Sequence, residues 1–183
     1  TDAKICCQIG HSGRKGSTQL GWETIDAPLQ DNNWDLVSAS AIPWSENNAT
    51  PREITLDEMN NVKSQFANSV LMAKRAGFDM IELHAAHGYL ISSFISPISN
   101  QREDEYGGTF DNRMRYPLEV FEAMRAVWPE DMPISVRISA NDWLGEAGVT
   151  PEQAVNISQV FADAGADLID VSAGQTSNEA KPI

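Results

Sequence analysis

Four short apolar runs divide the chain, and glycine, proline or polar residues bound each of them. They comprise residues 4–10, 78–84, 133–139 and 167–174. Each run is too short for a typical helix, and nearly continuous apolar character is typical of strands that are covered on both faces. The pattern therefore predicts four strands of a parallel sheet.

Apolar residues at helical spacing lie between the strands and predict three helices. The helices cover residues 55–77, 113–128 and 150–165. Their apolar faces comprise Leu56, Met59, Val62, Phe66 and Val70 in the first, Leu118, Phe121, Met124, Val127 and Trp128 in the second, and Ala154, Ile157, Phe161 and Ala164 in the third. Thr55 and Thr150 are expected to cap helix starts, and Gly77 and Gly165 to end helices. Pro117 is expected to kink the second helix or to mark its start.

The connections between these elements differ in length at the two ends of the strands. Helices lead into the next strand within a few residues, whereas the segments after strands, residues 10–54 and 85–112, are long. This asymmetry is typical of a TIM (β/α)₈ barrel, in which function gathers at the carboxyl ends of the strands. We therefore predict an α/β fold that is part of such a barrel, with a flavodoxin-like open sheet as the alternative.

Four strands are too few for a whole barrel, which needs eight strands and usually about 250 residues. The chain of 183 residues also begins at Thr1 without a methionine. We therefore expect residues 1–183 to form a single partial barrel domain, truncated at both ends. A complete small α/β domain is the other interpretation.

Composition narrows the possible partners and the location. The net charge of −13 repels phosphodiester backbones, so nucleic acid and anionic membrane surfaces are poor partners. No apolar stretch approaches the length of a membrane span and no signal peptide opens the chain, which favours a cytoplasmic protein. Cys6 and Cys7 are adjacent, and a disulfide between them would be strained, so we expect buried thiols in a reducing compartment.

Two of the three histidines, His84 and His87, lie in "ELHAAHGYL", directly after the second predicted strand. A metal site is disfavoured, because the spacing does not match helical zinc motifs and few further ligands lie nearby. Two core histidines bonded to backbone remain an alternative. In the functional interpretation, a bend with freedom at Gly88 aims both imidazoles at one point, where they polarise a carbonyl or phenolate oxygen. Tyr89 is then a candidate proton donor.

Polar residues at the ends of other strands add candidates. Arg137 lies inside an apolar strand, so it needs either an acidic neighbour or an anionic or electron-rich ligand. Gln8 could hydrogen-bond a flavin edge or only backbone. Near it lie His11, Arg14 and Lys15, and we expect loop structure for the first two. Three tryptophans of the long first loop could line a substrate entrance or cap the core: Trp22, Trp34 and Trp44.

Several blocks of the chain together resemble the Old Yellow Enzyme family of FMN-dependent oxidoreductases. They are "QIGHSGRK", "HAAHGYLISSFISPISNQREDEYGGTFDNRMRYPLEV" and "VRISANDW", and the resemblance covers nearly all 183 residues. Within the family, the chain is most similar to the reductase part of bifunctional monooxygenase-reductases that act on salicylyl-CoA or 2-aminobenzoyl-CoA. The resemblance implies a TIM barrel, of which these residues hold about strands 3 to 6.

The resemblance also implies roles for the candidate residues. Gln8 would hydrogen-bond FMN and Arg137 would stabilise its reduced form. His84 and His87 would bind the substrate oxygen, and Tyr89 would protonate the alkene carbon opposite the one that receives hydride. NADH or NADPH would supply the electrons, and the substrate would be an activated alkene or a dearomatised CoA thioester, including an aromatic acyl-CoA.

The resemblance leaves part of the barrel outside the chain. The loops after strands 7 and 8, which usually bind phosphate in barrels, are absent, so we expect that these residues alone do not complete the FMN site. Two unpaired sheet edges favour self-association and a homo-oligomer. Two alternatives remain, a metal-free barrel lyase or isomerase that uses His84 and His87 as acid and base, and a barrel fragment without catalysis.

Overall fold

The computed structural model describes residues 2–24 and 26–180. Its main sheet has four parallel strands in the spatial order β1-β4-β5-β6. The strands are β1 (Cys6–Ile9), β4 (Met80–Ala85), β5 (Ile134–Ser139) and β6 (Leu168–Ser172). Each lies within or overlaps one of the four predicted runs, so the prediction of a parallel sheet is confirmed.

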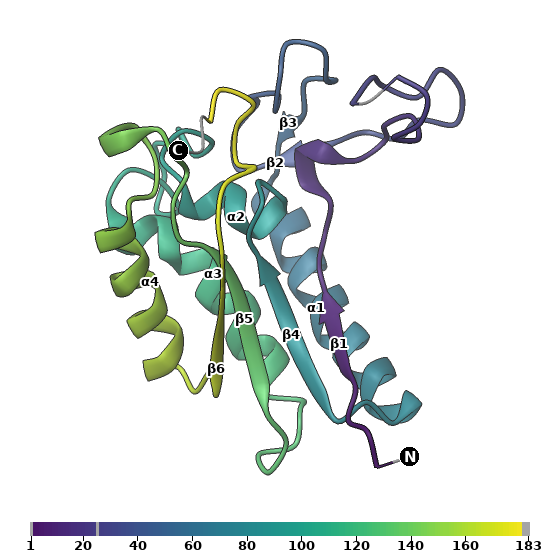
Figure 1. The fold of residues 1–183 in the computed structure, drawn as a ribbon, viewed down its shortest axis with the longest axis vertical. Coiled ribbons are helices and arrows are strands. Elements are labelled where there is room, and N and C mark those ends of the chain that lie inside the picture. The colour runs from purple at the N-terminus through teal and green to yellow at the C-terminus, as the bar shows by residue number, and fades with distance from the viewer. Residues whose placement is uncertain (1, 25, 181–183) are drawn as a thin grey trace.

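Three long helices, α1 (Leu56–Ala76), α3 (Phe110–Arg125) and α4 (Pro151–Asp163), lie on one face of this sheet (Figure 1). Thr55 forms the predicted capping box with Glu58, and Thr150 accepts a hydrogen bond from the backbone N–H of Gln153. Gly77 ends α1 in the left-handed conformation, with φ 81°. A doubly wound sheet carries helices on both faces, so this arrangement favours the barrel over the flavodoxin-like alternative.

The predicted helix faces need three corrections. Leu56 is 50% exposed, because it is the first residue of α1 and lies outside the buried stripe. The middle helix begins at Phe110, where Thr109 caps it, so Pro117 lies inside the helix rather than at its start. Leu118 and Val127 are half-buried, and the fully buried positions of α3 include Tyr116 and Val120 instead.

Several short elements were not predicted. They are the 3₁₀ turns η1 (Gly13–Lys15) and η2 (Gly145–Ala147), the strands β2 (Val37–Ser38) and β3 (Arg52–Glu53), and the helix α2 (Leu90–Ile95). All lie in the long segments that follow the carboxyl ends of β1, β4 and β5. Each is at most six residues long, which is too short to produce a clear hydrophobic period.

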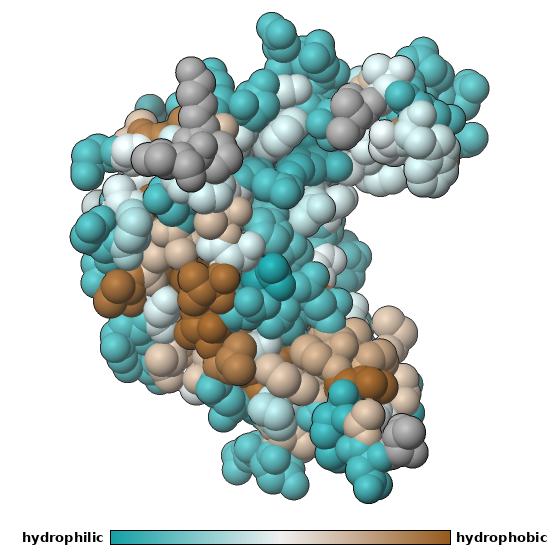
Figure 2. All heavy atoms as spheres, in the orientation of Figure 1, coloured by the Kyte–Doolittle hydropathy of each residue, from teal (hydrophilic) through white to brown (hydrophobic). Residues whose placement is uncertain are grey.

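The two faces of the sheet differ, which corrects the expectation that both are apolar and covered. On the helix side of the central strands, Ile81, Leu83, Ile134 and Val136 belong to the hydrophobic core and are fully buried. Residues paired across parallel strands share a face, and the inner face carries polar rows. One row is Gln8, Glu82, Ser135 and Leu168, and the next contains His84, Arg137 and Asp170. Figure 2 views this inner face, where hydrophilic and hydrophobic residues are mixed.

The expectation of buried thiols is wrong for Cys6. Cys6 is exposed, Cys7 is half-buried, and both are free thiols. Cys6 belongs to β1, an edge strand whose inner face is open here, and the apolar character of the run does not reveal which face is covered. Among the described residues, no helix combines the length and the apolar character that crossing a membrane requires.

The burial of α4 gives a direct test of this packing. Phe161 of α4 is fully buried against Phe121 of α3, with ring centroids 5.7 Å apart. We expect Phe161→Ala to lower the free energy of unfolding by about 3–5 kcal/mol, measured by urea denaturation. On the same helix Val155 is 67% exposed, so Val155→Ala should change stability by no more than about 0.5 kcal/mol. Equal effects of the two substitutions would contradict the face assigned to α4.

Candidate active site

The structure brings His84, His87 and Tyr89 together at the carboxyl end of β4. The ring centroids of His84 and His87 are 5.0 Å apart, and those of His84 and Tyr89 are also 5.0 Å apart. Both ring pairs meet edge to face, with interplanar angles of 72° and 65°. The three side chains therefore share one location instead of diverging from the strand.

A left-handed bend produces this convergence. His87 has φ 62° and Gly88 has φ 74°, a conformation that is costly for a residue with a side chain. Two serines hold the bend, because the His87 N–H donates to Ser139 Oγ at 2.9 Å and the Gly88 N–H donates to Ser92 Oγ at 3.2 Å. A Cβ atom at Gly88 would lie 2.7 Å from the carbonyl oxygen of Gln175, so this position requires glycine.

Gln8 is oriented by a carboxylate on the inner face of the sheet. Its Nε2 donates to Glu82 Oε1 at 2.8 Å, and Ser135 Oγ donates to Glu82 Oε2 at 2.7 Å. A carboxylate only accepts hydrogen bonds, so the Gln8 amide must present nitrogen to Glu82. Its carbonyl oxygen stays available to a ligand. Glu82 comes two residues before His84 on the same face of β4, and its role was not evident from the sequence.

Arg137 lies beside His84 in the strand register and pairs with an acidic neighbour. Its guanidinium donates to Asp170 Oδ2 at 2.7 Å, and both side chains are about one-third exposed. The salt bridge foreseen as one alternative is therefore present. Among the described residues, Arg137 Nε is buried and has no hydrogen-bond partner. The pair thus leaves the Nε–H, together with the other guanidinium N–H groups that do not bond Asp170, for a ligand.

Burial and nearby cations keep the two imidazoles neutral. The pKa of His84 is lowered to about 4, mainly by burial and further by the charges of His87, Arg137 and Lys15, while Asp170 opposes the shift. The pKa of His87 is lowered by burial, Arg137 and Lys15, again against Asp170. Near neutral pH both rings therefore act as hydrogen-bond donors without a charge of their own.

The histidine rings also differ in their partners. His87 Nε2 lies 2.6 Å from Ser172 Oγ of β6, which fixes the orientation of this ring. In the described part of the chain, His84 Nδ1 is buried without a partner. Two buried, unpaired donors or acceptors, His84 Nδ1 and Arg137 Nε, therefore lie on one row of the inner face.

Lys15 of η1 is a site residue whose role the sequence did not reveal. Its Nζ donates to the His87 carbonyl oxygen at 3.0 Å and lies 5.1 Å from the ring centroid of Tyr89. It also lies 4.8 Å from the ring centroid of Trp44. Burial lowers the pKa of Lys15 to about 8, Asp26 opposes this shift, and Arg14 adds to it. Its charge therefore acts on the phenol and on the backbone of the bend.

Arg14 and His11 both support loops, as expected, but His11 does more. Buried Arg14 donates to the carbonyl oxygens of Ile42 and Thr176 and so joins three loops. His11 Nδ1 accepts from the Gly13 N–H at 3.0 Å. His11 also lines the hollow of the site, a position that was not evident from the sequence.

The hollow in front of the imidazoles has a volume of about 380 Å³. Its lining comprises Gln8, Gly10, His11, Ser12, His84, His87 and Tyr89. A Cβ atom at Gly10 would come within 3.2 Å of His84 Cβ, so this glycine leaves room for the ring. Gln8 and the two histidines thus face one space.

The tryptophans of the first loop do not share one role. Trp22 is 82% exposed and Trp34 is 57% exposed, so neither caps the core of this structure. Trp44 is half-buried, and its Nε1 donates to the Gln175 carbonyl oxygen at 2.8 Å. Only Trp44 therefore lies against the residues of the site, through Lys15 and the loop after β6.

Comparison with known proteins places the chain among flavin enzymes. A model of the NADH:flavin oxidoreductase / NADH oxidase family matches residues 1–182. An NADPH dehydrogenase of Clostridium acetobutylicum is 43% identical over 172 residues, which cover 94% of this chain and 47% of that protein. The chain spans about half the length of the curated relatives it matches.

Solved structures agree with the partial barrel. A 2-naphthoyl-CoA reductase superposes with a TM-score of 0.81 and 27% identity, over 97% of this chain and 27% of that one. An old yellow enzyme homologue from Zymomonas mobilis superposes with a TM-score of 0.66 and 29% identity, over 75% of this chain and 42% of that one. The prediction of an incomplete TIM barrel is confirmed.

Two glycines with positive φ allow the bend to be tested. We expect Gly88→Ala to disorder the site, because its Cβ atom would collide with Gln175 in addition to straining the backbone. Gly77 has φ 81° and open space around it, so Gly77→Ala should cost only the left-handed strain, about 1 kcal/mol. Histidine side-chain NMR signals should move for Gly88→Ala alone. Unchanged signals in both variants would contradict the assigned contact.

The depressed pKa of His84 also has a consequence for stability. Its pKa is about 4 in the folded protein against an ordinary value of 6.5. The unfolded chain therefore binds this proton first, and His84 makes stability fall as the pH drops from about 6.5 towards 4. We expect His84→Asn to have a shallower loss of unfolding free energy over this range, measured by urea denaturation at several pH values. If the unfolding free energies of the two proteins changed in parallel with pH, the lowered pKa of His84 would be refuted.

Proposed function

Because the chain belongs to the NADH:flavin oxidoreductase / NADH oxidase family, we propose that the protein carrying it is an oxidoreductase of Old Yellow Enzyme type. The family uses FMN as cofactor and NAD(P)H as electron donor. One observation carries the proposal: two neutral imidazoles and a phenol converge over a hollow that Gln8 also lines, beside Arg137.

The residues on the inner face suit the polar edge of a flavin ring. Glu82 turns the Gln8 amide so that its carbonyl oxygen can accept from a ring N–H. Arg137 keeps a buried, unpaired Nε–H that can donate to a ring nitrogen or carbonyl. Gln8 and Arg137 would therefore hold the ring, and FMN, when bound, supplies the hydride that NAD(P)H provides.

His84 and His87 would bind the oxygen of the substrate. Neutral imidazoles donate N–H bonds without a formal charge, and burial strengthens bonds to the negative charge that develops on a carbonyl or phenolate oxygen. Polarising this oxygen withdraws electrons from the distant alkene carbon. That carbon then accepts hydride more readily.

Tyr89 would donate a proton to the adjacent alkene carbon, which completes the reduction. Its ring lies edge to face with His84, and the Lys15 ammonium lies 5.1 Å from its centroid. A positive charge at that position stabilises the phenolate that proton donation leaves behind. Arg137 would stabilise the negative charge of the reduced flavin.

The substrate would be an activated alkene or a dearomatised CoA thioester. The 2-naphthoyl-CoA reductase is named for an aromatic CoA thioester, and its TM-score of 0.81 supports an aromatic acyl-CoA as one substrate class. We also propose that the protein is most similar to the reductase part of monooxygenase-reductases that act on salicylyl-CoA or 2-aminobenzoyl-CoA. A CoA thioester suits His84 and His87, because its carbonyl oxygen is the group that they would polarise.

The remaining expectations concern the domain organisation, the oligomeric state and the cellular location of the protein. Residues 1–183 would act as a single partial barrel domain, and the edge strands β1 and β6 have no neighbour on one side within the described residues, which favours a homo-oligomer. Two free thiols, Cys6 and Cys7, agree with a cytoplasmic location. Sedimentation of residues 1–183 by themselves tests this expectation, because further strands would pair both edges in a complete barrel, and a stable monomer would contradict it.

Replacing the phenol separates the two halves of the reaction. In the full-length protein, Tyr89→Phe should slow substrate reduction by about 10²–10⁴-fold, while NAD(P)H still bleaches the yellow flavin at the normal rate in anaerobic stopped-flow experiments. Tyr106 bonds Glu119 away from the site, so Tyr106→Phe should leave both rates unchanged. A folded but colourless protein would favour the lyase or isomerase, and a Tyr89→Phe variant with full activity would exclude this proton donor.

A further inference from the structure

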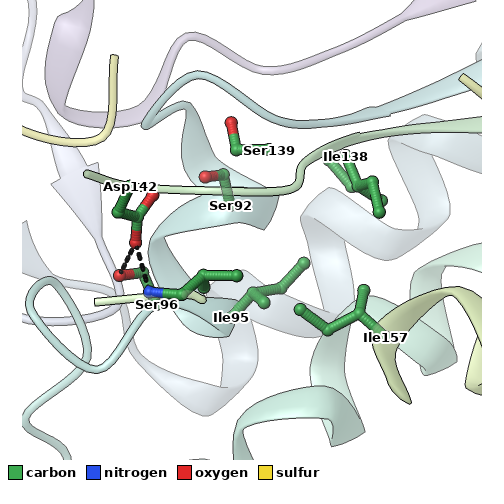
Figure 3. A pocket seen from close by; sticks show the side chains of 9 residues that line it. Ser92, Ile95, Ser96, Ile138, Ser139, Asp142 and Ile157 are labelled. Atoms are coloured by element: carbon green, nitrogen blue, oxygen red, sulfur yellow. Dashed lines mark hydrogen bonds between the residues drawn. The ribbon is translucent and has the colours of Figure 1, made fainter. Parts of the chain in front are cut away.

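A small cavity lies directly behind the bend that carries His87. It lies between β4, β5, α2 and α4, and its polar lining includes Ser92, Ser139 and Asp142 (Figure 3). The space open to the centre of a water molecule is about 10 Å³. This is close to the least room that a single water needs.

Asp142 brings an incompletely bonded carboxylate to this cavity. The side chain is fully buried, and its Oδ2 accepts from Ser96 Oγ at 2.7 Å and from the Val149 N–H at 2.8 Å, the two bonds drawn in Figure 3. Oδ1 is buried and has no partner among the described residues. A buried carboxylate oxygen without a donor is costly. Asp142 Oδ1 therefore needs a donor at this position.

Ser92 and Ser139 have complementary capacity. Ser139 Oγ accepts from the His87 N–H and donates to the Gly174 carbonyl oxygen, so one of its lone pairs is free. Ser92 Oγ accepts from the Gly88 N–H, and its own proton donates to no acceptor within the described part of the chain. The three residues that carry these unused groups, one donor and two acceptors, all line the same small cavity.

We propose that this cavity is a binding site for one structural water, which donates to Asp142 Oδ1 and Ser139 Oγ and accepts from the Ser92 hydroxyl. Three hydrogen bonds are the usual number for a buried water. The water completes a polar chain from a buried carboxylate to the two serines that hold the bend. Asp142 is then a positioning residue, which acts on His87 through the water and Ser139.

The bend explains why such a link would affect the site. His87 and Gly88 both have positive φ, and their N–H groups end on Ser139 and Ser92. Fixing the two hydroxyls therefore fixes the conformation that aims the His87 ring. The water site follows from the cavity and its polar groups, whereas its effect on substrate reduction rests on the proposed function.

A crystal structure of the full-length protein, at a resolution that shows ordered water, tests the site directly. We expect density within hydrogen-bond distance of Asp142 Oδ1, Ser92 Oγ and Ser139 Oγ. A cavity without density, or Asp142 Oδ1 bonded to a protein donor, would overturn the proposal. This result does not depend on whether the protein binds a flavin.

A substitution that fills the cavity tests the water through the direction in which the urea midpoint changes. Val149 lines the cavity, and Val149→Ile adds one methylene, whose position the crystal structure of the variant reports. If the methylene displaces a water, Asp142 Oδ1 loses its donor and the urea midpoint falls. If the cavity is dry, the added group improves packing, and an unchanged or higher midpoint would refute the water.

Amide hydrogen exchange tests the link to the bend. Ser92→Ala removes the acceptor of the Gly88 N–H directly, and in the proposed network it also reaches the His87 N–H through the water and Ser139. We expect the His87 amide to exchange about tenfold faster in this variant, which corresponds to the loss of about one hydrogen bond. Ser99 is an equally buried serine outside the cavity, so Ser99→Ala should leave this amide unchanged. Faster exchange at Gly88 alone would contradict the proposed link from Ser92 through the water to Ser139.

Kinetics of the flavin-bound protein distinguish the proposed water from the proposed function. Ser92→Ala should slow substrate reduction by about tenfold and leave flavin reduction by NAD(P)H unchanged, because Ser92 lies behind the bend. If the unsubstituted protein reduces no flavin, the proposed function fails while the density and exchange results still decide the water. If both half-reactions slow equally, Ser92 is a general structural residue and the positioning role is rejected.

Discussion

The left-handed bend at His87 and Gly88 is the constraint on which the site depends. Two consecutive residues of positive φ turn the chain directly after β4. This turn brings the phenol of Tyr89 back towards His84. The bend is strained at His87, so the surrounding structure must hold it. Ser92 and Ser139 do so by accepting hydrogen bonds from its two N–H groups. The carbonyl oxygen of Gln175 leaves no room for a side chain at Gly88.

Electrostatics then set what this geometry can do. His84 and His87 are partly buried beside two cations, Lys15 and Arg137, so both rings remain neutral while the site as a whole favours negative charge. Asp170 opposes this effect and pairs with Arg137. Neutral N–H donors beside two cations favour an anionic or electron-rich ligand over a metal cation.

The second half of the long block that resembles the family, residues 100–113, has a structural function in this chain. Arg102 bonds Asp104 and the carbonyl oxygens of Ala39 and Ile54, and Arg113 bonds the carbonyl oxygen of Ile95. These contacts join the rim loops to one another and to the start of α3. Residues that identify a family therefore need not touch a ligand, and here they hold the rim to which α2 and the bend belong.

The sequence by itself determined the four strands, the three long helices, their parallel order and the cluster of His84, His87 and Tyr89, because hydrophobic period, caps and spacing are local properties. It did not reveal the exposure of Cys6, the Gln8–Glu82–Ser135 chain, or the contact of Lys15 with the bend. Only the tertiary structure decided these features. They depend on which strands become neighbours and in which register. Gln8 and Glu82, for example, are 74 positions apart in the chain and meet only after the sheet has formed.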